Sequence, residues 1–204
     1  LRKCCAALLA ILAVYAAPAA EKTVYLKDFL APGAAGTDAV PAVRAALEHC
    51  AEVGASRLVL PGGESTTQGK LLAELGMLEP LRERIEDGMP VLATCAGLIL
   101  LARRLDAHDD RGAPRIATLD VLVRRNAYGR QLGSFRTSLE LAGMGTVPAT
   151  FIRAPFIMET GRSVETLATC DGNVVAVQQG KQLALAFHPE LDEDPRIHQL
   201  FLDL

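Results

Sequence analysis

A cysteine stands where one apolar run ends and another begins, in the stretch VLATCAGLILL. We expect a strand over residues 89–94 and a helix over 96–105, so Cys95 occupies a sharp turn, the geometry of a nucleophile elbow. The adjoining helix N-terminus favours a thiolate, and its backbone N–H groups can hold an oxyanion. A buried, inert thiol is the competing interpretation, and this stretch does not decide between the two.

A histidine and a glutamate follow the apolar stretch LALAF. His188 and Glu190 are two residues apart, so on an extended chain their side chains point the same way. A carboxylate fixes the tautomer of a neighbouring imidazole, which can then act as base toward a cysteine. A surface His-Pro-Glu turn is the alternative. A metal site is not expected, because no third ligand is evident.

A third polar cluster lies in LVLPGGESTT, again after a short apolar run. The two glycines let backbone N–H groups approach a ligand, while Glu64 and Ser65 add a charge and a hydroxyl. An ordinary turn followed by a helix cap is the alternative. The stretch does not fit a phosphate-binding loop, because Glu64 would repel phosphate and the P-loop spacing is absent.

The order of expected elements explains why these clusters belong together. Strands and helices alternate through the first half, which predicts parallel β-α-β units that bind ligands at the carboxyl ends of the strands. The second half, from residue 117, is rich in β-forming residues. Besides the two elements around Cys95, we expect strands at 22–29, 56–60, 117–125, 130–141, 148–156, 163–169, 173–179 and 182–188, and helices at 39–54, 69–88 (interrupted by Gly76) and 194–204.

Composition limits the classes of function. The chain has 204 residues, enough for one medium domain or one domain with an appendage, and half of them are hydrophobic. The net charge of −3 and the absence of a Lys/Arg run after the first residues argue against nucleic-acid binding. The five cysteines form no C-x-x-C pair, so we expect reduced thiols rather than disulfides or a zinc site.

The first 20 residues have the layout of a secretory signal peptide, with Arg2 and Lys3, an apolar stretch, and small residues at APAA. A buried helix is the alternative, since Ala and Leu favour helices. The apolar stretch is short for a membrane span. We therefore treat 1–20 as a signal-like segment, 21–56 as a strand-helix segment, and 57–204 as the main domain.

Five motifs in order, PGGEST, TCAGLILLA, RNAYGRQ, FIRAPF and FHPEL, resemble the glutaminase subunit of pyridoxal 5′-phosphate synthase, a class I (triad) glutamine amidotransferase. The resemblance runs from about Arg57 to Leu204. It implies an α/β three-layer sandwich around a mixed, largely parallel sheet. It also implies hydrolysis of L-glutamine to L-glutamate and ammonia, without a cofactor. The ammonia would pass to a separate (β/α)8 synthase subunit in a large hetero-oligomer.

The resemblance assigns roles to individual residues. Cys95 matches the nucleophile, His188 the base and Glu190 the acid that orients it. Backbone N–H groups near Gly63 and Ala96 match the oxyanion donors. The residues that match glutamine-binding positions are Gly63, Glu64, Ser65, Arg125, Ile152 and Arg153.

The chain also departs from this family. Ala93 replaces the usual elbow glycine, and upstream of residue 57 a second strand and a Gln-Gly loop are missing. Residues 22–57 instead resemble the opening of pectate-lyase-type β-helix proteins, which suggests a fusion. The family's activity belongs in the cytoplasm, whereas the signal-like start would direct export. The alternative function is therefore a fused or exported chain with intact triad motifs and impaired or no glutaminase activity.

Overall fold

The computed structural model describes most of the chain from residue 55 onward and two short segments before it. The described residues are 13–16, 23–25, 55–108, 110, 112–125 and 134–204. The helices are α3 (Ser65–Glu74), α4 (Leu78–Glu86), α5 (Ala96–Leu101), the short 3-10 helix η2 (Pro189–Leu191) and α6 (Arg196–Leu202). The strands are β1 (Ala13–Ala16), β2 (Thr23–Tyr25), β3 (Ala55–Leu60), β4 (Val91–Thr94), β5 (Ala102–Leu105), β6 (Leu119–Arg124), β7 (Ser134–Leu141), β8 (Gly145–Ile152), β9 (Phe156–Thr160), β10 (Glu165–Cys170), β11 (Asn173–Gln179) and β12 (Gln182–Leu185).

Ten of these strands form one mixed sheet, in the order β2-β1-β3-β4-β12-β11-β9-β6-β5 with β10 paired to β11. The mixed α/β fold expected from the sequence is confirmed, but the sheet is not largely parallel as expected. Parallel pairing is limited to β3, β4 and β12 at the centre and to β5 with β6 at one edge. The other described pairs are antiparallel, and one of them, β11 with β12, is joined by a short hairpin, which only antiparallel neighbours allow.

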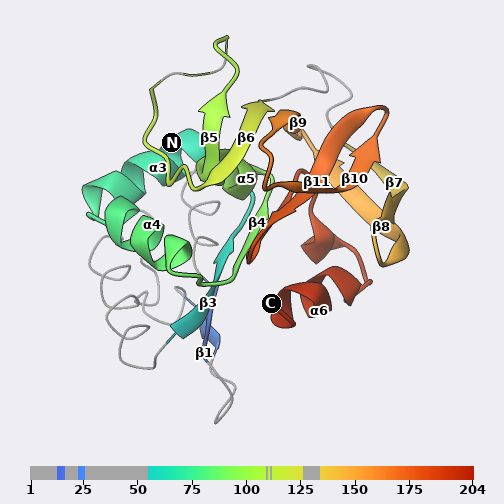
Figure 1. Cartoon of the computed structure of the whole chain (residues 1–204), viewed down its shortest axis with the longest axis horizontal. Coiled ribbons are helices and arrows are strands. Elements are labelled where there is room, and N and C mark those ends of the chain that lie inside the picture. Colours follow the sequence, from blue (N-terminus) through green and yellow to red (C-terminus); the bar gives the residue numbers. More distant parts are fainter. Residues whose placement is uncertain (1–12, 17–22, 26–54, 109, 111, 126–133) are drawn as a thin grey trace, which may run out of the picture.

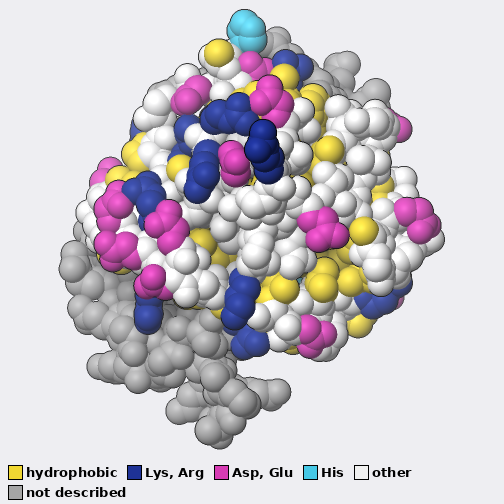
Figure 2. Space-filling view, viewed as in Figure 1, with side chains coloured by type: hydrophobic (Ala, Val, Ile, Leu, Met, Phe, Trp, Pro, Cys, Tyr) yellow, Lys and Arg dark blue, Asp and Glu magenta, His cyan; other side chains and the backbone are white. Residues whose placement is uncertain are grey.

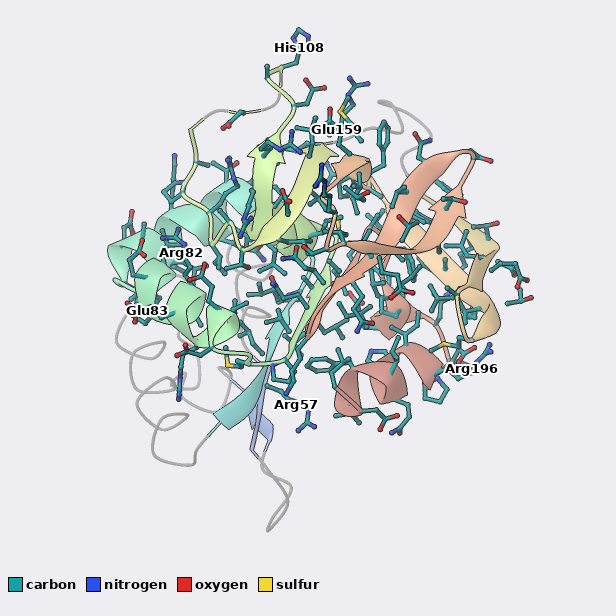
Figure 3. The ribbon with its side chains drawn as sticks, in the orientation of Figure 1. Arg57, Arg82, Glu83, His108, Glu159 and Arg196 are labelled. Carbon is teal, nitrogen blue, oxygen red and sulfur yellow. The ribbon has the colours of Figure 1, made fainter. Side chains whose placement is uncertain are left out.

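Helices cover both faces of the central strands. Figure 1 shows α3 and α4 on one side of β3 and β4, and α6 on the other. The central strands β4 and β12 are buried at every position, as expected for strands packed on both faces. Arg57, labelled at the lower end of β3 in Figure 3, donates a hydrogen bond to the Leu202 carbonyl at 2.8 Å and so links β3 to α6.

The hairpin of β7 and β8 forms a second, two-stranded sheet beside the main one. Three aromatic rings join the two sheets. The ring of Phe135 stacks on that of Phe151 with centroids 4.6 Å apart, and Phe151 lies 5.5 Å from Phe187. Since Phe187 directly precedes His188, the hairpin packs next to the end of β12.

Charges of both signs share the surface. On the face shown in Figure 2, Lys and Arg side chains lie among Asp and Glu side chains. Among the described residues, Arg104 pairs with Glu159 at 2.8 Å and Arg124 with Asp106 at 2.6 Å. The face drawn in Figure 2 therefore has no continuous basic surface of the kind that nucleic acids bind.

Two helices expected from the sequence have different outcomes. The single helix expected over 96–105 is wrong in its second half, because the helix ends at Leu101 and the next residues form β5. Pairing with β6 overrides the helical propensity of this stretch: Ala102 and Leu105 are buried while the two arginines between them are exposed. The helix expected over 39–54 lies outside the described residues.

The N-terminal segments contribute strands to the sheet. Residues 13–16, within the signal-like segment, form β1 and pair antiparallel with β3. The strand expected at 22–29 is described over Thr23–Tyr25, as β2 at the edge of the sheet. A strand therefore lies next to β3, although the sequence offered no second strand between residues 29 and 57.

Gly97 allows α5 to pack directly on β3, because a Cβ atom there would overlap the carbonyl oxygen of Leu60. We expect Gly97→Ala to lower the free energy of unfolding by about 3 kcal/mol or more in urea denaturation, as in other overpacked cores. Gly76→Ala is the control, since its Cβ would meet no atom and only its positive φ of 68° is strained, at about 1 kcal/mol. Equal losses in the two variants would contradict this account.

Candidate active site

Cys95 lies at the turn between β4 and α5. Its backbone has a φ of 48°, in the left-handed region that non-glycine residues rarely adopt. Its N–H donates to the carbonyl of Leu185, the last residue of β12, at 2.8 Å. Ala96 begins α5, so its N–H belongs to the first helical turn, where backbone donors have no acceptor within the helix. The sharp turn expected from the sequence is therefore present, and its strain is of the kind found at functional sites.

His188 and Glu190 follow β12 and contact each other. The backbone N–H of His188 donates to the Thr150 carbonyl in β8 at 2.8 Å. Pro189 begins the short helix η2, which places Glu190 beside the imidazole, with 2.7 Å between His188 Nδ1 and Glu190 Oε1. The Cys95 side chain is also close enough to His188 to raise the pKa of the imidazole. Thiol, imidazole and carboxylate thus form one continuous chain of contacts.

The imidazole of His188 holds its proton unusually strongly. Burial by itself lowers the pKa, but the hydrogen bonds and negative charges of Cys95 and Glu190 outweigh burial and raise the pKa of His188 from 6.5 to about 9. The group is therefore a cation at neutral pH. Its contribution to folding stability is complete below pH 6.5 and is lost as the pH rises through about 9.

The two described cysteines are both buried and free, but their surroundings differ. Burial, together with the charge of Asp171, raises the pKa of the Cys170 thiol, which favours an inert neutral group. Cys95 instead adjoins the His188 imidazole, a group that can act as a base toward a cysteine. The surroundings therefore favour the nucleophile interpretation for Cys95.

The glycine loop between β3 and α3 packs against the imidazole. A Cβ atom on Gly62 would overlap Cε1 of His188, and Gly63 has a φ of 139° that favours glycine. Sequence reasoning passed over Gly62 as a site residue, although the doubled glycine pointed to a close approach. It also missed Gln68, whose buried amide donates to the carbonyls of Pro61 and Gly62 at 3.4 and 3.3 Å.

Two predicted glutamine-binding residues, Glu64 and Arg125, contact each other. The Glu64 carboxylate caps α3 by accepting from the N–H groups of Thr66 and Thr67 at 3.2 and 2.7 Å, and Arg125 Nη2 lies 3.1 Å from its Oε1. Partial burial alone would raise the pKa of Glu64, but the hydrogen bonds from Thr67 and Thr66 outweigh it and lower the pKa to about 2. Ser65, the first residue of α3, is buried.

The remaining predicted pair, Ile152 and Arg153, lies at the end of β8. The Ile152 carbonyl accepts a hydrogen bond from Cys95 Sγ at 3.8 Å, so this strand end adjoins the thiol. Arg153 is exposed and has a φ of 44°, a second strained backbone position beside the site. The structure thus places all of the predicted residues on the loops and strand ends around Cys95 or in contact with them.

Two other kinds of site are absent from the part of the chain that the structure describes. No group of three or more His, Cys, Asp or Glu side chains there is arranged to hold a metal ion. Among the same residues, no helix is long and apolar enough to cross a membrane.

The sequence matches the SNO glutamine amidotransferase family over residues 34–204. The chain belongs to this family. The match starts before the expected boundary near residue 57, so it includes part of the 21–56 segment. This agrees with the geometry, since a Cys-His-Glu arrangement is the triad of class I glutamine amidotransferases.

Individual relatives agree with this assignment. Pyridoxal 5′-phosphate synthase subunit PdxT of Desulfitobacterium hafniense is 62% identical over 146 residues, which are 72% of each chain. The subunit of the same name from Streptococcus pneumoniae is 52% identical over 149 residues, 73% of this chain and 75% of the relative. A crystal structure of a glutamine amidotransferase superposes with a TM-score of 0.69 at 46% identity, covering 74% of this chain and 79% of that one.

Replacing the carboxylate of Glu190 tests its contact with His188. We expect Glu190→Gln to lower the pKa of His188 by about one unit, because the imidazolium loses an adjacent negative charge. The measurement is an NMR titration of histidine-labelled protein, with the His188 resonance assigned from its loss in His188→Gln. Glu193→Gln, which removes an exposed carboxylate nearby, is the control and keeps the wild-type midpoint. A Glu190→Gln midpoint unchanged from wild type would refute the contact.

Proposed function

We propose that this chain is the glutaminase subunit of a pyridoxal 5′-phosphate synthase and hydrolyses L-glutamine to L-glutamate and ammonia for vitamin B6 biosynthesis. The observation that carries the proposal is the contact chain from Cys95 through His188 to Glu190, just after the parallel strands β4 and β12 of a glutamine amidotransferase. The names of the relatives support the assignment to pyridoxal phosphate synthesis in particular.

The reaction follows from the charges at the site. The Cys95 thiolate attacks the side-chain amide carbon of glutamine, and backbone N–H groups of Gly63 and Ala96 stabilise the oxyanion. Protonated His188 donates its proton to the leaving nitrogen, which departs as ammonia and leaves a thioester. Neutral His188 then takes a proton from water, whose hydroxide releases glutamate and restores the thiolate.

The charges of Glu64 and Arg125 suit the zwitterionic end of glutamine. The cation of Arg125 and the anion of Glu64 lie side by side, which matches an α-carboxylate next to an α-ammonium group. We assign glutamine binding to these two residues together with the loop and strand-end residues Gly63, Ser65, Ile152 and Arg153.

The ammonia passes, in this proposal, to a separate (β/α)8 synthase subunit within a larger hetero-oligomer. Free ammonia becomes protonated and diffuses away in water, so direct transfer between subunits protects the product. We expect this complex in the cytoplasm, where glutamine and phosphorylated sugars are present.

The test is ammonia release from glutamine by the purified chain, with and without a synthase subunit. We expect activity that rises with the synthase and falls about 10⁴-fold or more in Cys95→Ala, as for other nucleophile deletions. Circular dichroism establishes that the variant is folded. A folded wild-type chain that releases no ammonia in either condition would refute the proposal.

Arg125 offers a separate test of substrate binding. We expect Arg125→Met to raise KM for glutamine about tenfold with a smaller change in kcat, because the lost contact is made in the ground state as well as the transition state. Arg124→Met is the matched control, since the neighbouring guanidinium pairs with Asp106 instead, and we expect its KM to stay at the wild-type value. A normal KM in Arg125→Met would exclude the assigned role.

A further inference from the structure

Strand β8 contacts both ends of the proposed catalytic pair through its backbone. The Thr150 carbonyl accepts the N–H of His188 at 2.8 Å, and the Ile152 carbonyl accepts from Cys95 Sγ at 3.8 Å. These carbonyls are two residues apart, so they lie on the same edge of the strand. The position of β8 therefore affects how the imidazole and the thiol meet.

Side chains from the same hairpin also hold the residues that follow Glu190. Arg136 Nε donates to Thr150 Oγ1 at 3.0 Å, and Arg136 Nη2 donates to the Leu191 carbonyl at 2.8 Å. Thr150 Oγ1 in turn donates to Asp192 Oδ1 at 3.0 Å, and Arg136 Nη2 lies 3.6 Å from the same oxygen. Glu190 thus lies between two points, His188 and Leu191, that are both fixed to β7 and β8.

The turn that carries Glu190 has little support of its own. Its two backbone hydrogen bonds, from Leu191 to His188 and from Asp192 to Pro189, are both 3.2 Å long. The Glu190 side chain is 43% exposed, so packing alone does not fix its rotamer. The orientation of this carboxylate therefore depends on contacts from outside the turn.

Asp192 couples these outside contacts. Its side chain is only 7% exposed, and its Oδ2 atom is buried with no hydrogen-bond partner among the described residues. A buried carboxylate is costly unless it is paired, so the buried position of Asp192 depends on Arg136 and Thr150. Removing either partner favours movement of Asp192 toward water, and the adjoining turn moves with it.

We propose that Arg136, Thr150 and Asp192 form a brace that holds Glu190 against the His188 imidazole during glutamine hydrolysis. They are positioning residues, because their side chains act on Glu190 and His188 rather than on the substrate. The inference rests on the proposed glutaminase function for its kinetic consequence, but the geometry of the turn can be measured without it.

Thr150→Val is the sharpest variant. It removes the hydroxyl that joins Arg136 to Asp192, while the size, the β-branching and the backbone carbonyl to His188 remain. With the synthase present, we expect kcat to fall about tenfold and KM to stay within about twofold of wild type, because the loss is one of orientation. The alkaline limb of the kcat profile and the His188 NMR midpoint should both move to lower pH, as in Glu190→Gln.

Arg196→Gln provides a matched control. Arg196, labelled at the lower right of Figure 3, binds the carbonyls of Met144 and Thr146 at 2.9 and 2.7 Å and pairs with Asp194 at 2.6 Å. It therefore ties the far end of the same hairpin to α6 without contacting the turn at Glu190. We expect the Arg196→Gln variant to have a lower free energy of unfolding, while its pH profile of kcat and its His188 titration midpoint stay at the wild-type values.

Combining Thr150→Val with Glu190→Gln distinguishes a loss of positioning from a general destabilisation of the fold. In a Glu190→Gln background, Thr150→Val should produce no further fall in kcat, because the carboxylate that it positions is already absent. If Thr150→Val does not fold, Arg136→Gln carries the same test, since that side chain is 69% exposed. Arg136→Lys should recover only part of the kcat that Arg136→Gln loses, because one ammonium group cannot make the several hydrogen bonds of the guanidinium group.

The outcomes distinguish the two proposals. A wild-type chain without glutaminase activity would overturn the proposed function, while the His188 midpoints of wild type, Thr150→Val and Arg196→Gln would still test the brace. The brace would be refuted if Thr150→Val and Arg136→Gln leave the titration midpoint of His188 unchanged. It would also be refuted if the losses of kcat from Thr150→Val and Glu190→Gln are additive.

Discussion

A nearly buried positive charge on His188 is the constraint around which this site is built. An imidazolium removed from water is stable only when negative groups replace the lost solvation. Here Cys95 and the carboxylate of Glu190 supply them. Cys95 is more than 90 residues away from His188 and Glu190 in the sequence, so the sheet must bring the thiol to the other two groups. Two features of the neighbourhood fit closely around this charge: Gly62, which leaves room for the ring, and Thr150, which accepts the backbone N–H of His188.

The register of the three central parallel strands produces that convergence. Leu60 of β3 lies beside Ala93 of β4, and Ala93 lies beside Ala184 of β12. The strands therefore end at almost the same level, and the residues that follow them form one edge. The glycine loop, the Cys95 turn and the His188 turn all leave the sheet there. The hydrogen bond from the Cys95 N–H to Leu185 extends this alignment one residue beyond the strands.

Sequence reasoning recovered the parts of the site that local chemistry determines. The turn at Cys95 can be predicted from the few residues around it, because a strand-forming run and a helix-forming run meet there. The contact of His188 with Glu190 can be predicted in the same way, because they are two residues apart after an apolar run. The contribution of β8 could not be found in this way, because the carbonyls of Thr150 and Ile152 are backbone groups without a side-chain signature. Strand β5 was mistaken for helix because its partner β6 is more than a dozen residues away, and pairing at that distance leaves no local pattern. Gln68 was missed because a polar residue inside a helix usually faces water.

The close approach at Gly97 divides the site into a rigid half and an adjustable half. Because α5 rests on the carbonyl of Leu60 with no intervening side chain, the helix cannot slide or rotate without a collision, and the thiol moves only with the sheet itself. The groups of Glu64 and Arg125 are held differently, since they meet through the charged ends of their side chains rather than through packed backbone. The side chains of Glu64 and Arg125 can therefore adjust to a ligand, while the packed core keeps Cys95 in place. The residues that recognise the substrate are therefore separate from the nucleophile. Substitutions at Glu64 and Arg125 could change the substrate preference without moving Cys95.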